Sequence, residues 1–173
     1  MDTHSTENYY LGKGIMKFDR LDTDGLPTGM RDLGNCPDFT IDIAIEKLEH
    51  FSSREASKTK DKTVVLSKGG TAKFTLDEYA IENLALALYG TITGADQINI
   101  LKASKIEGEI EFTGTNAIGP NFIARLWKVS INPTGGFPFI GDDWGKISVE
   151  AEIMADDTRP DNPYGIVYEI GES

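Results

Sequence analysis

Residues 39–46 read Phe-Thr-Ile-Asp-Ile-Ala-Ile-Glu, and this stretch decides the fold class. Its apolar side chains recur at every second position, at Phe39, Ile41, Ile43 and Ile45. The positions between them are polar or small. Successive side chains of a β-strand point to opposite faces, so a period of two predicts a strand with one buried face and one solvent-facing face.

The same alternation recurs along most of the chain. It predicts further strands at residues 15–21, 63–66, 71–76, 106–112, 122–131, 147–153 and 165–170. The 122–131 segment carries apolar residues on both faces, so we expect it to be buried on both sides or to lie at an interface. The triplet Lys68-Gly69-Gly70 separates two of these strands and predicts a hairpin turn, because glycine adopts the positive φ of tight turns.

One segment, residues 79–89, departs from this pattern. Four apolar residues have the i, i+3, i+4, i+7 spacing of a helical stripe: Ile81, Leu84, Ala85 and Leu88. Asp77 is the expected N-cap, and Gly90 is expected in the left-handed position after the helix. The sequence therefore predicts a mainly β fold, a two-sheet antiparallel sandwich or barrel with one short flanking helix. Residues 1–173 are expected to form a single domain.

Composition excludes several classes of function. The 173 residues contain 17 Lys or Arg and 28 Asp or Glu, which gives a net charge of −11. A domain this acidic repels phosphate backbones, so nucleic-acid binding through a basic surface is not expected. No apolar run approaches the roughly 20 residues of a membrane-spanning helix, and residues 1–10 lack the layout of a signal peptide. We therefore expect that the protein is made in the cytoplasm and does not associate with a membrane.

Catalytic and metal-binding constellations are not recognisable. Cys36 is the single cysteine, which excludes an intrachain disulfide, and neither His4 nor His50 has a motif partner. The acid pairs at 142–143 and 156–157 lie next to turn residues, and adjacent side chains in a strand would point to opposite faces. The sequence thus predicts a protein that is not an enzyme and needs no metal or cofactor.

Charge is divided unevenly along the chain. Residues 52–62, SSREASKTKDK, are predicted to form a long loop between two strands. Residues 52–73 carry six basic and two acidic residues, a net +4, whereas residues 142–173 carry nine acidic and two basic residues, a net −7. This division suits head-to-tail stacking of identical copies. The alternative is a lysine-rich loop that is simply solvated.

Three stretches of the chain together resemble the major tail tube proteins of long, non-contractile-tailed bacteriophages. They are DFTIDIAIEKLEHFSSREASKTKDKTVV (38–65), KGGTAKFTLDEYAIENLALALYG (68–90) and EIEFTGTNAIGPNFIARLWKVSINPTGGFPFIGDDWGKISVEAEIMAD (109–156). The resemblance lies in the order and spacing of these features. It spans roughly residues 10–157.

The resemblance implies a β-sandwich subunit that forms hexameric rings, which stack into the hollow tail tube through which DNA is delivered. The 52–62 loop would then reach the adjacent ring through Arg54, Lys58, Lys60 and Lys62. Residues 1–12 would be a flexible N-terminal segment that orders on assembly, and residues 158–173 a C-terminal strand or extension. Implied partners are further copies of the chain and the tape-measure, tail terminator and tail-tip proteins. The implied location is the virion, after synthesis in the host bacterial cytoplasm.

The net charge agrees with this expectation. A lysine-lined conduit would bind DNA phosphates, whereas an acidic one lets DNA pass without specific binding. In tube proteins of this kind the lumen is lined by strands of the inner sheet. Two sets of acids are candidates, Asp42 with Glu46, or Glu107 with Glu109 and Glu111. The alternative for each set is a solvated outer surface.

Two other functions stay open. One is a different member of the tube fold group, a tail-completion protein or a secretion-tube component. The other is a monomeric carbohydrate-binding β-sandwich that uses Trp127, Trp144 and Tyr164 as stacking platforms. For Trp144, within Asp-Asp-Trp-Gly, we expect packing inside the protein.

Overall fold

The computed structural model describes residues 4–171. The elements in this range are a 3-10 turn, a short α-helix and ten strands. In chain order they are η1 (Thr6–Asn8), β1 (Gly14–Arg20), β2 (Arg31–Asp32), β3 (Asp38–Ser52), β4 (Thr59–Leu76), α1 (Ile81–Ala87), β5 (Thr91–Thr93), β6 (Gln97–Asn99), β7 (Glu107–Gly114), β8 (Asn121–Pro133), β9 (Ile147–Ile153) and β10 (Gly165–Ile170).

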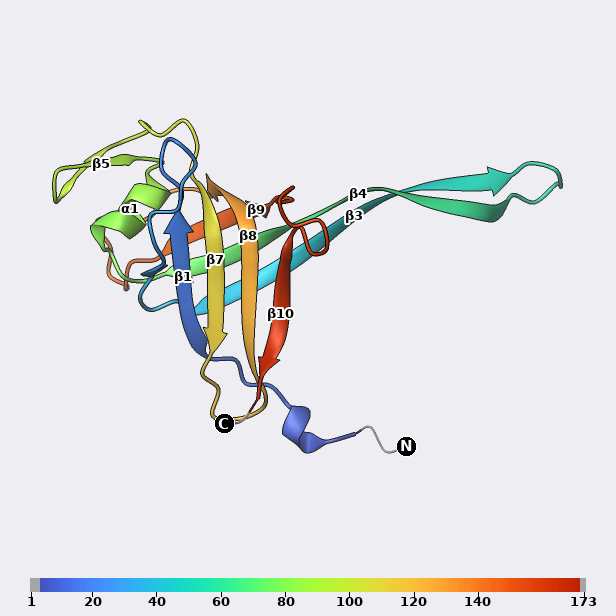
Figure 1. Ribbon diagram of the computed structural model, residues 1–173, viewed down its shortest axis with the longest axis horizontal. Coiled ribbons are helices and arrows are strands. Elements are labelled where there is room, and N and C mark those ends of the chain that lie inside the picture. The colour runs from blue at the N-terminus through green and yellow to red at the C-terminus, as the bar shows by residue number, and fades with distance from the viewer. Residues whose placement is uncertain (1–3, 172–173) are drawn as a thin grey trace.

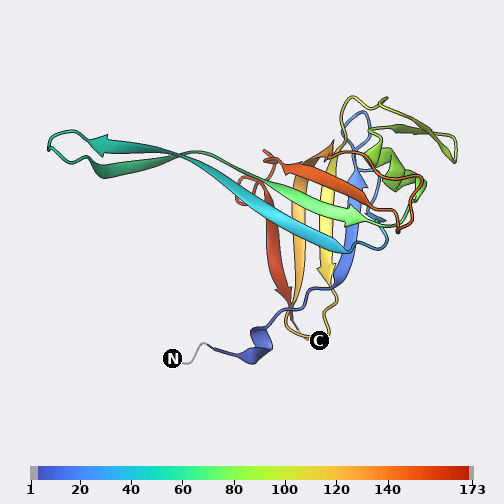
Figure 2. The same ribbon diagram turned by 180° about the vertical axis from the view of Figure 1, so that it is seen from behind.

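Eight strands form one antiparallel sheet that branches at β8. The order is β2-β1-β7-β8-β9-β4-β3, and β10 also pairs with β8. Residues 121–126 of β8 pair with β10, whereas residues 129–133 pair with β9. The sheet thereby divides into two layers, one of β1, β7, β8 and β10 and one of β9, β4 and β3 (Figures 1 and 2). The mainly β, antiparallel fold with one short helix is confirmed, and β5 and β6 add a small second sheet.

The hydrophobic core lies between the two layers. β1 and β7 contribute Met16, Phe18 and Ile110, and β4 contributes Phe74, all at most 3% exposed. The predicted inward face of 147–153 is confirmed, because its alternate apolar residues are buried. Burial of each large apolar side chain contributes about 1.5–3 kcal/mol to the free energy of unfolding. Residues 122–131 were expected to be buried on both faces, but only Ala124, Leu126, Val129 and Ile131 are buried and the other residues of the segment are partly exposed.

Helix α1 is shorter than predicted by two residues at each end. Its N-cap is Ala80, which makes no side-chain capping hydrogen bond. Asp77 instead accepts a hydrogen bond from the Asn35 side chain at 2.6 Å. The left-handed residue after the helix is Tyr89 (φ 49°), not Gly90. Gly90 is required for a different reason, since a Cβ there would lie 2.5 Å from a side chain of β6.

The predicted turn at Lys68-Gly69-Gly70 is wrong. β4 runs through these residues without interruption, and the chain reverses at residues 53–58. A Cβ on Gly70 would lie 2.6 Å from the Asp42 carbonyl oxygen. The glycine therefore serves the close approach of two strands rather than a turn.

The single buried face predicted for β3 is correct only at its start. Phe39 and Ile41 pack against the core. Ile43 and Ile45 follow the same alternation but are 71% and 50% exposed. The reason is that the strand leaves the body of the protein after this point, so residues 4–171 leave that face largely open to solvent (Figure 1).

Candidate functional site

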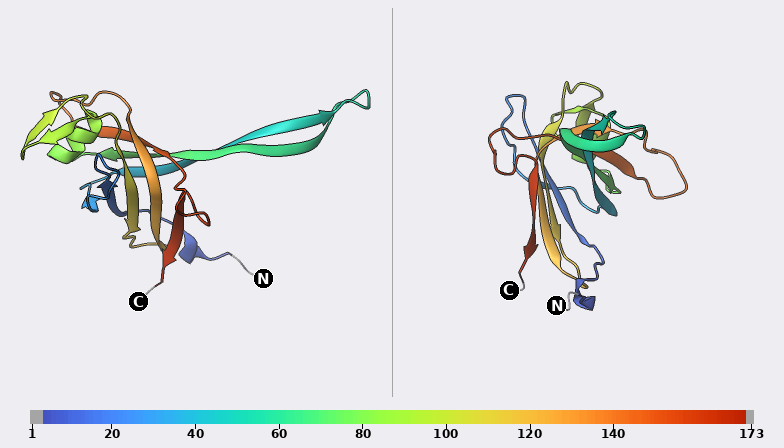
Figure 3. Two further views of the ribbon diagram at one scale, coloured as in Figure 1. Left: turned by 45° about the horizontal axis from the view of Figure 1, so that its top comes forward. Right: turned by 90° about the vertical axis from the view of Figure 1, so that its right-hand side faces the viewer.

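A long two-stranded hairpin projects from the body of the protein (Figures 1 and 3). We call residues 44–69 the arm: the distal part of β3, the 53–58 turn and the distal part of β4. β4 pairs with β9 only from Gly70 onward, so within residues 44–69 the two strands pair only with each other. Eleven residues of β4 at about 3.3 Å each give the arm a length of about 35 Å.

The arm carries apolar side chains that the described part of the chain, residues 4–171, leaves about half exposed. They are Ile45, Leu48, Phe51, Val64, Val65 and Leu66, each between 45% and 59% exposed. Register shifts between Glu46 and Lys47 and between His50 and Phe51 twist the ribbon. An isolated two-stranded ribbon is marginally stable in water at best. These exposed side chains are thus available for contact with a second surface.

The basic residues predicted to lie in one loop are divided between the 53–58 turn and strand β4. The 52–62 loop is wrong in extent, because only residues 53–58 lie outside strands, so Lys60 and Lys62 belong to β4. Lys60 forms an ion pair with Glu49 across the ribbon. Arg54, Lys58 and Lys62 have no ion-pair partner among residues 4–171. β4 begins at Thr59, close to the tip, which shortens the loop.

One acid from each candidate set, Asp42 and Glu107, lies on the same line across the sheet. Strand register places five residues side by side across β3, β4, β9, β8 and β7: Asp42, Thr71, Glu152, Ser130 and Glu107. We call this line of side chains the acidic row. Glu46 lies on the same face and accepts a hydrogen bond from Ser67 at 3.0 Å. Sequence reasoning missed Glu152 as a site residue, although its outward position was visible in the 147–153 alternation.

The acidic row and its neighbours form an acidic face. Glu150 also points outward on β9, so the face carries Asp42, Glu46, Glu107, Glu150 and Glu152. Lys73 lies among these acids, 3.0 Å from Asp42 and 3.8 Å from Glu150. Its pKa is raised by the hydrogen bond and charge of Asp42 and by Glu150. At the end of the row, Lys105 lies 3.1 Å from Glu107. The acids outnumber the bases, so the face is electronegative.

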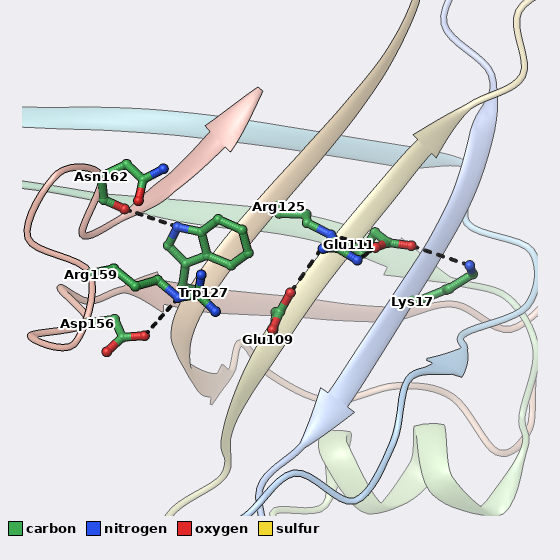
Figure 4. A network of polar contacts seen from close by, with 8 residues as sticks. All are labelled: Lys17, Glu109, Glu111, Arg125, Trp127, Asp156, Arg159 and Asn162. Atoms are coloured by element: carbon green, nitrogen blue, oxygen red, sulfur yellow. Dashed lines mark hydrogen bonds and ion pairs between the residues drawn. The ribbon is translucent and has the colours of Figure 1, made fainter. Parts of the chain in front are cut away.

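Glu109 and Glu111 lie apart from the acidic row, within a network of cations (Figure 4). A register shift between Gly108 and Ile110 separates them from Glu107. Glu111 is 9% exposed and accepts hydrogen bonds from Arg125 Nε at 2.6 Å and Lys17 Nζ at 3.3 Å. Burial raises the pKa of Glu111, but the hydrogen bonds from Arg125 and Lys17 outweigh it and hold this pKa below its usual value. Burial raises the pKa of Glu109, and the positive charge of Arg125, 4.0 Å away, opposes this rise only in part.

The family described as protein of unknown function UCP028589 matches residues 9–96 and 91–166. The chain belongs to this family. No curated protein matches it. The matched ranges include the whole arm, the acidic row and the Glu111 network, so these features belong to the part of the chain that the family shares.

Two strands of the body, β3 and β10, have an unpaired edge among residues 4–171. β3 lies at one end of the sheet order, opposite β2, and β10 branches from the sheet by pairing with β8. An apolar groove of about 310 Å³ lies between them, lined by residues that include Ile41, Ile43, Leu126 and Val167. Unpaired edges beside an apolar groove are a template for association with another chain.

The three candidate stacking aromatics are in different environments. The guanidinium of Arg159 covers the Trp127 ring at 3.9 Å, and the Trp127 indole N–H donates to the Asn162 carbonyl at 3.0 Å (Figure 4). The Tyr164 hydroxyl donates to the Lys68 carbonyl at 3.0 Å. Trp144 is 93% exposed, so the expectation that it packs inside the protein is wrong.

The described residues contain neither a helix that is long and apolar enough to cross a membrane nor a cluster of three or more His, Cys, Asp or Glu side chains arranged to hold a metal ion.

Proposed function

We propose that the protein is a structural subunit that assembles into a hollow tube, the tail tube of a long, non-contractile-tailed bacteriophage. The observation that carries this proposal is the arm. It is about 35 Å long by the rise of a strand and exposes six large apolar side chains that residues 4–171 of the same chain do not cover. A monomeric protein has no use for such a surface, whereas a subunit buries it against another copy.

The unpaired edges of β3 and β10 support the same proposal. In an assembly, edge strands are satisfied by sheet continuation into the next subunit, and the apolar groove between them is covered. The resemblance to tail tube proteins adds the arrangement: hexameric rings that stack along one axis. The arm then extends toward the adjacent ring.

The acidic face is our candidate for the lumen wall. It carries five carboxylates with few cations among them, so it repels the phosphates of passing DNA and gives no specific binding. Glu109 and Glu111 are less suitable, because Arg125 and Lys17 neutralise much of their charge. Of the two candidate sets, the proposal therefore favours Asp42 with Glu46 and adds Glu107 and Glu152.

The proposed tube role implies the partners and the location of the protein. Its partners are further copies of the chain, the tape-measure protein, the tail terminator and the tail-tip proteins. Its location is the virion, after synthesis in a bacterial cytoplasm, and it catalyses no reaction. A tail-completion or secretion-tube role would use the same arm with a different ring or partner. A carbohydrate-binding role is less supported, because Arg159 already covers the Trp127 ring.

Sedimentation of the purified protein tests this proposal. Leu48→Ser with Val64→Ser removes two exposed apolar side chains from facing positions of the arm. The matched control is Leu26→Ser with Ile118→Ser, which are 59% and 57% exposed in loops of the body. We expect wild type and the control to sediment as rings or larger assemblies and the arm variant to sediment as a monomer. Equal assembly of all three proteins would refute the role of the arm.

A further inference from the structure

The β8–β9 connection, residues 134–146, is an anchored loop, which we call the Asp-Trp loop. The Tyr79 hydroxyl donates to the Pro138 carbonyl at 2.8 Å, and the Tyr79 and Phe137 rings meet edge to face with centroids 5.7 Å apart. A Cβ on Gly145 would lie 2.4 Å from the Tyr79 hydroxyl, so glycine permits this close contact. The backbone of the loop is thus held against the body.

This anchored loop presents large apolar side chains to solvent. Phe139, Ile140 and Trp144 are 74%, 95% and 93% exposed. An exposed indole on a fixed backbone loses little conformational entropy on binding and is typical of an interface hot spot. The loop is therefore built as a contact surface.

A shallow hollow beside Trp144 has the chemistry of a cation site. Its volume is about 270 Å³, and its lining includes Trp144, Phe139, Tyr79 and the carboxyl-bearing Asp77 and Asp143. Aromatic faces and carboxylates together attract a guanidinium or ammonium group. The matching ligand is a basic side chain that stands next to apolar residues.

We propose that this hollow binds the arm tip of a second copy of the chain, with Arg54 or Lys58 as the inserted cation. The tip combines these two cations, which lack an ion-pair partner among residues 4–171, with the exposed Phe51. It therefore complements the hollow in both charge and apolar character.

The two surfaces lie at opposite ends of the molecule. β4 runs from the arm tip at Thr59 to Leu76, and Tyr79 follows shortly after and holds the Asp-Trp loop. Eighteen residues at about 3.3 Å place the ends of β4 about 60 Å apart. Figures 1 and 2 show the arm tip and the helix α1 at opposite ends of the molecule. The arm cannot reach its own loop. Contact between opposite ends of two copies is head-to-tail and repeats along an assembly.

Photo-crosslinking tests this inference, which rests on the proposed self-assembly. Trp144 is replaced by the photoreactive residue p-benzoylphenylalanine, the full-length protein is irradiated, and cross-linked peptides are identified by mass spectrometry. We expect cross-linked dimers and higher ladders joined to peptides from residues 52–62. Cross-links to any other segment, or irradiated protein that stays monomeric, would overturn the inference.

Electron microscopy of the same samples separates the two proposals. Tubes with cross-links elsewhere would refute the docking site and leave the tube function standing. Cross-links to the arm tip without rings or tubes would support the docking site and count against the tube.

Charge reversal gives an independent test by sedimentation. Arg54→Glu with Lys58→Glu, or Asp77→Lys with Asp143→Lys, is expected to weaken association at least about tenfold. Combining all four substitutions should restore it. The control matched to the aspartate pair is Asp24→Lys with Asp161→Lys, which makes the same change in net charge at exposed sites elsewhere. Failure of the fourfold variant to recover, or equal weakening by the control, would contradict the pairing.

Discussion

Replacing Glu111 by Gln removes a buried negative charge while keeping the shape of the side chain. Glu111 accepts hydrogen bonds from both Arg125 and Lys17. Hydrogen bonds to charged groups contribute about 1.5–3 kcal/mol each when they are buried. The Arg125 and Lys17 side chains are 39% and 38% exposed, so water replaces much of the lost interaction. We therefore expect a loss of about 1–2 kcal/mol in the free energy of unfolding.

The measurement is urea and thermal unfolding at pH 7. For a chain of this size the loss corresponds to a decrease in Tm of about 3–6 °C. The matched control is Glu152→Gln, an outward-facing acid of the acidic row, for which a change within about 0.5 kcal/mol is expected. Equal Tm values for the two variants would refute the assignment of Glu111 as a stabilising group and Glu152 as a surface charge.

The pH dependence has a definite sign. Because the folded-state pKa of Glu111 is lowered, its charge stabilises the protein fully above the pKa of the unfolded state, about 4.3. This stabilisation is lost as pH falls through the lowered folded-state pKa. The difference in stability between wild type and Glu111→Gln should therefore shrink below about pH 4. A difference that stays constant into that range would contradict the network.

Three further outcomes are expected. Glu152→Lys tubes should co-sediment with duplex DNA at low salt and release it as salt rises, whereas wild-type tubes should not bind it. Ring or tube formation should quicken from dilute buffer to molar sodium chloride, because screening weakens repulsion among subunits of net charge −11, and light scattering that is insensitive to salt would contradict this. Burial raises the pKa of the Cys36 thiol to about 11, so its alkylation at pH 8 should be at least about tenfold slower than in the urea-unfolded chain.

Strand alternation predicted most of the sheet because the period of two is a local property of the backbone. It correctly indicated the buried residues of 147–153 and the strand at 165–170. It could not show that Ile43 and Ile45 are exposed, since alternation reports a shared face and not whether anything covers it. The pair Gly69-Gly70 is typical of a turn in sequence. Here Gly70 instead allows the backbone of the neighbouring strand β3 to approach closely.

The candidate site was harder to predict because it depends on sheet order. Asp42 and Glu107 lie 65 positions apart in the chain and join one row only through four strand pairings, which run through three intervening residues. Glu111 was predicted to face the lumen or solvent, and its pairing with Arg125 on the neighbouring strand could not be seen from sequence. The exposure of Trp144 likewise follows from how Tyr79 anchors a distant loop.

Negative-stain electron microscopy of the purified protein, fresh and after concentration in moderate salt, shows whether the chain assembles into a tube. We expect rings and hollow, striated tubes for the wild type and their absence for Leu48→Ser with Val64→Ser. Uniform small particles of the wild type at every concentration and salt would contradict self-assembly of the chain into a tube.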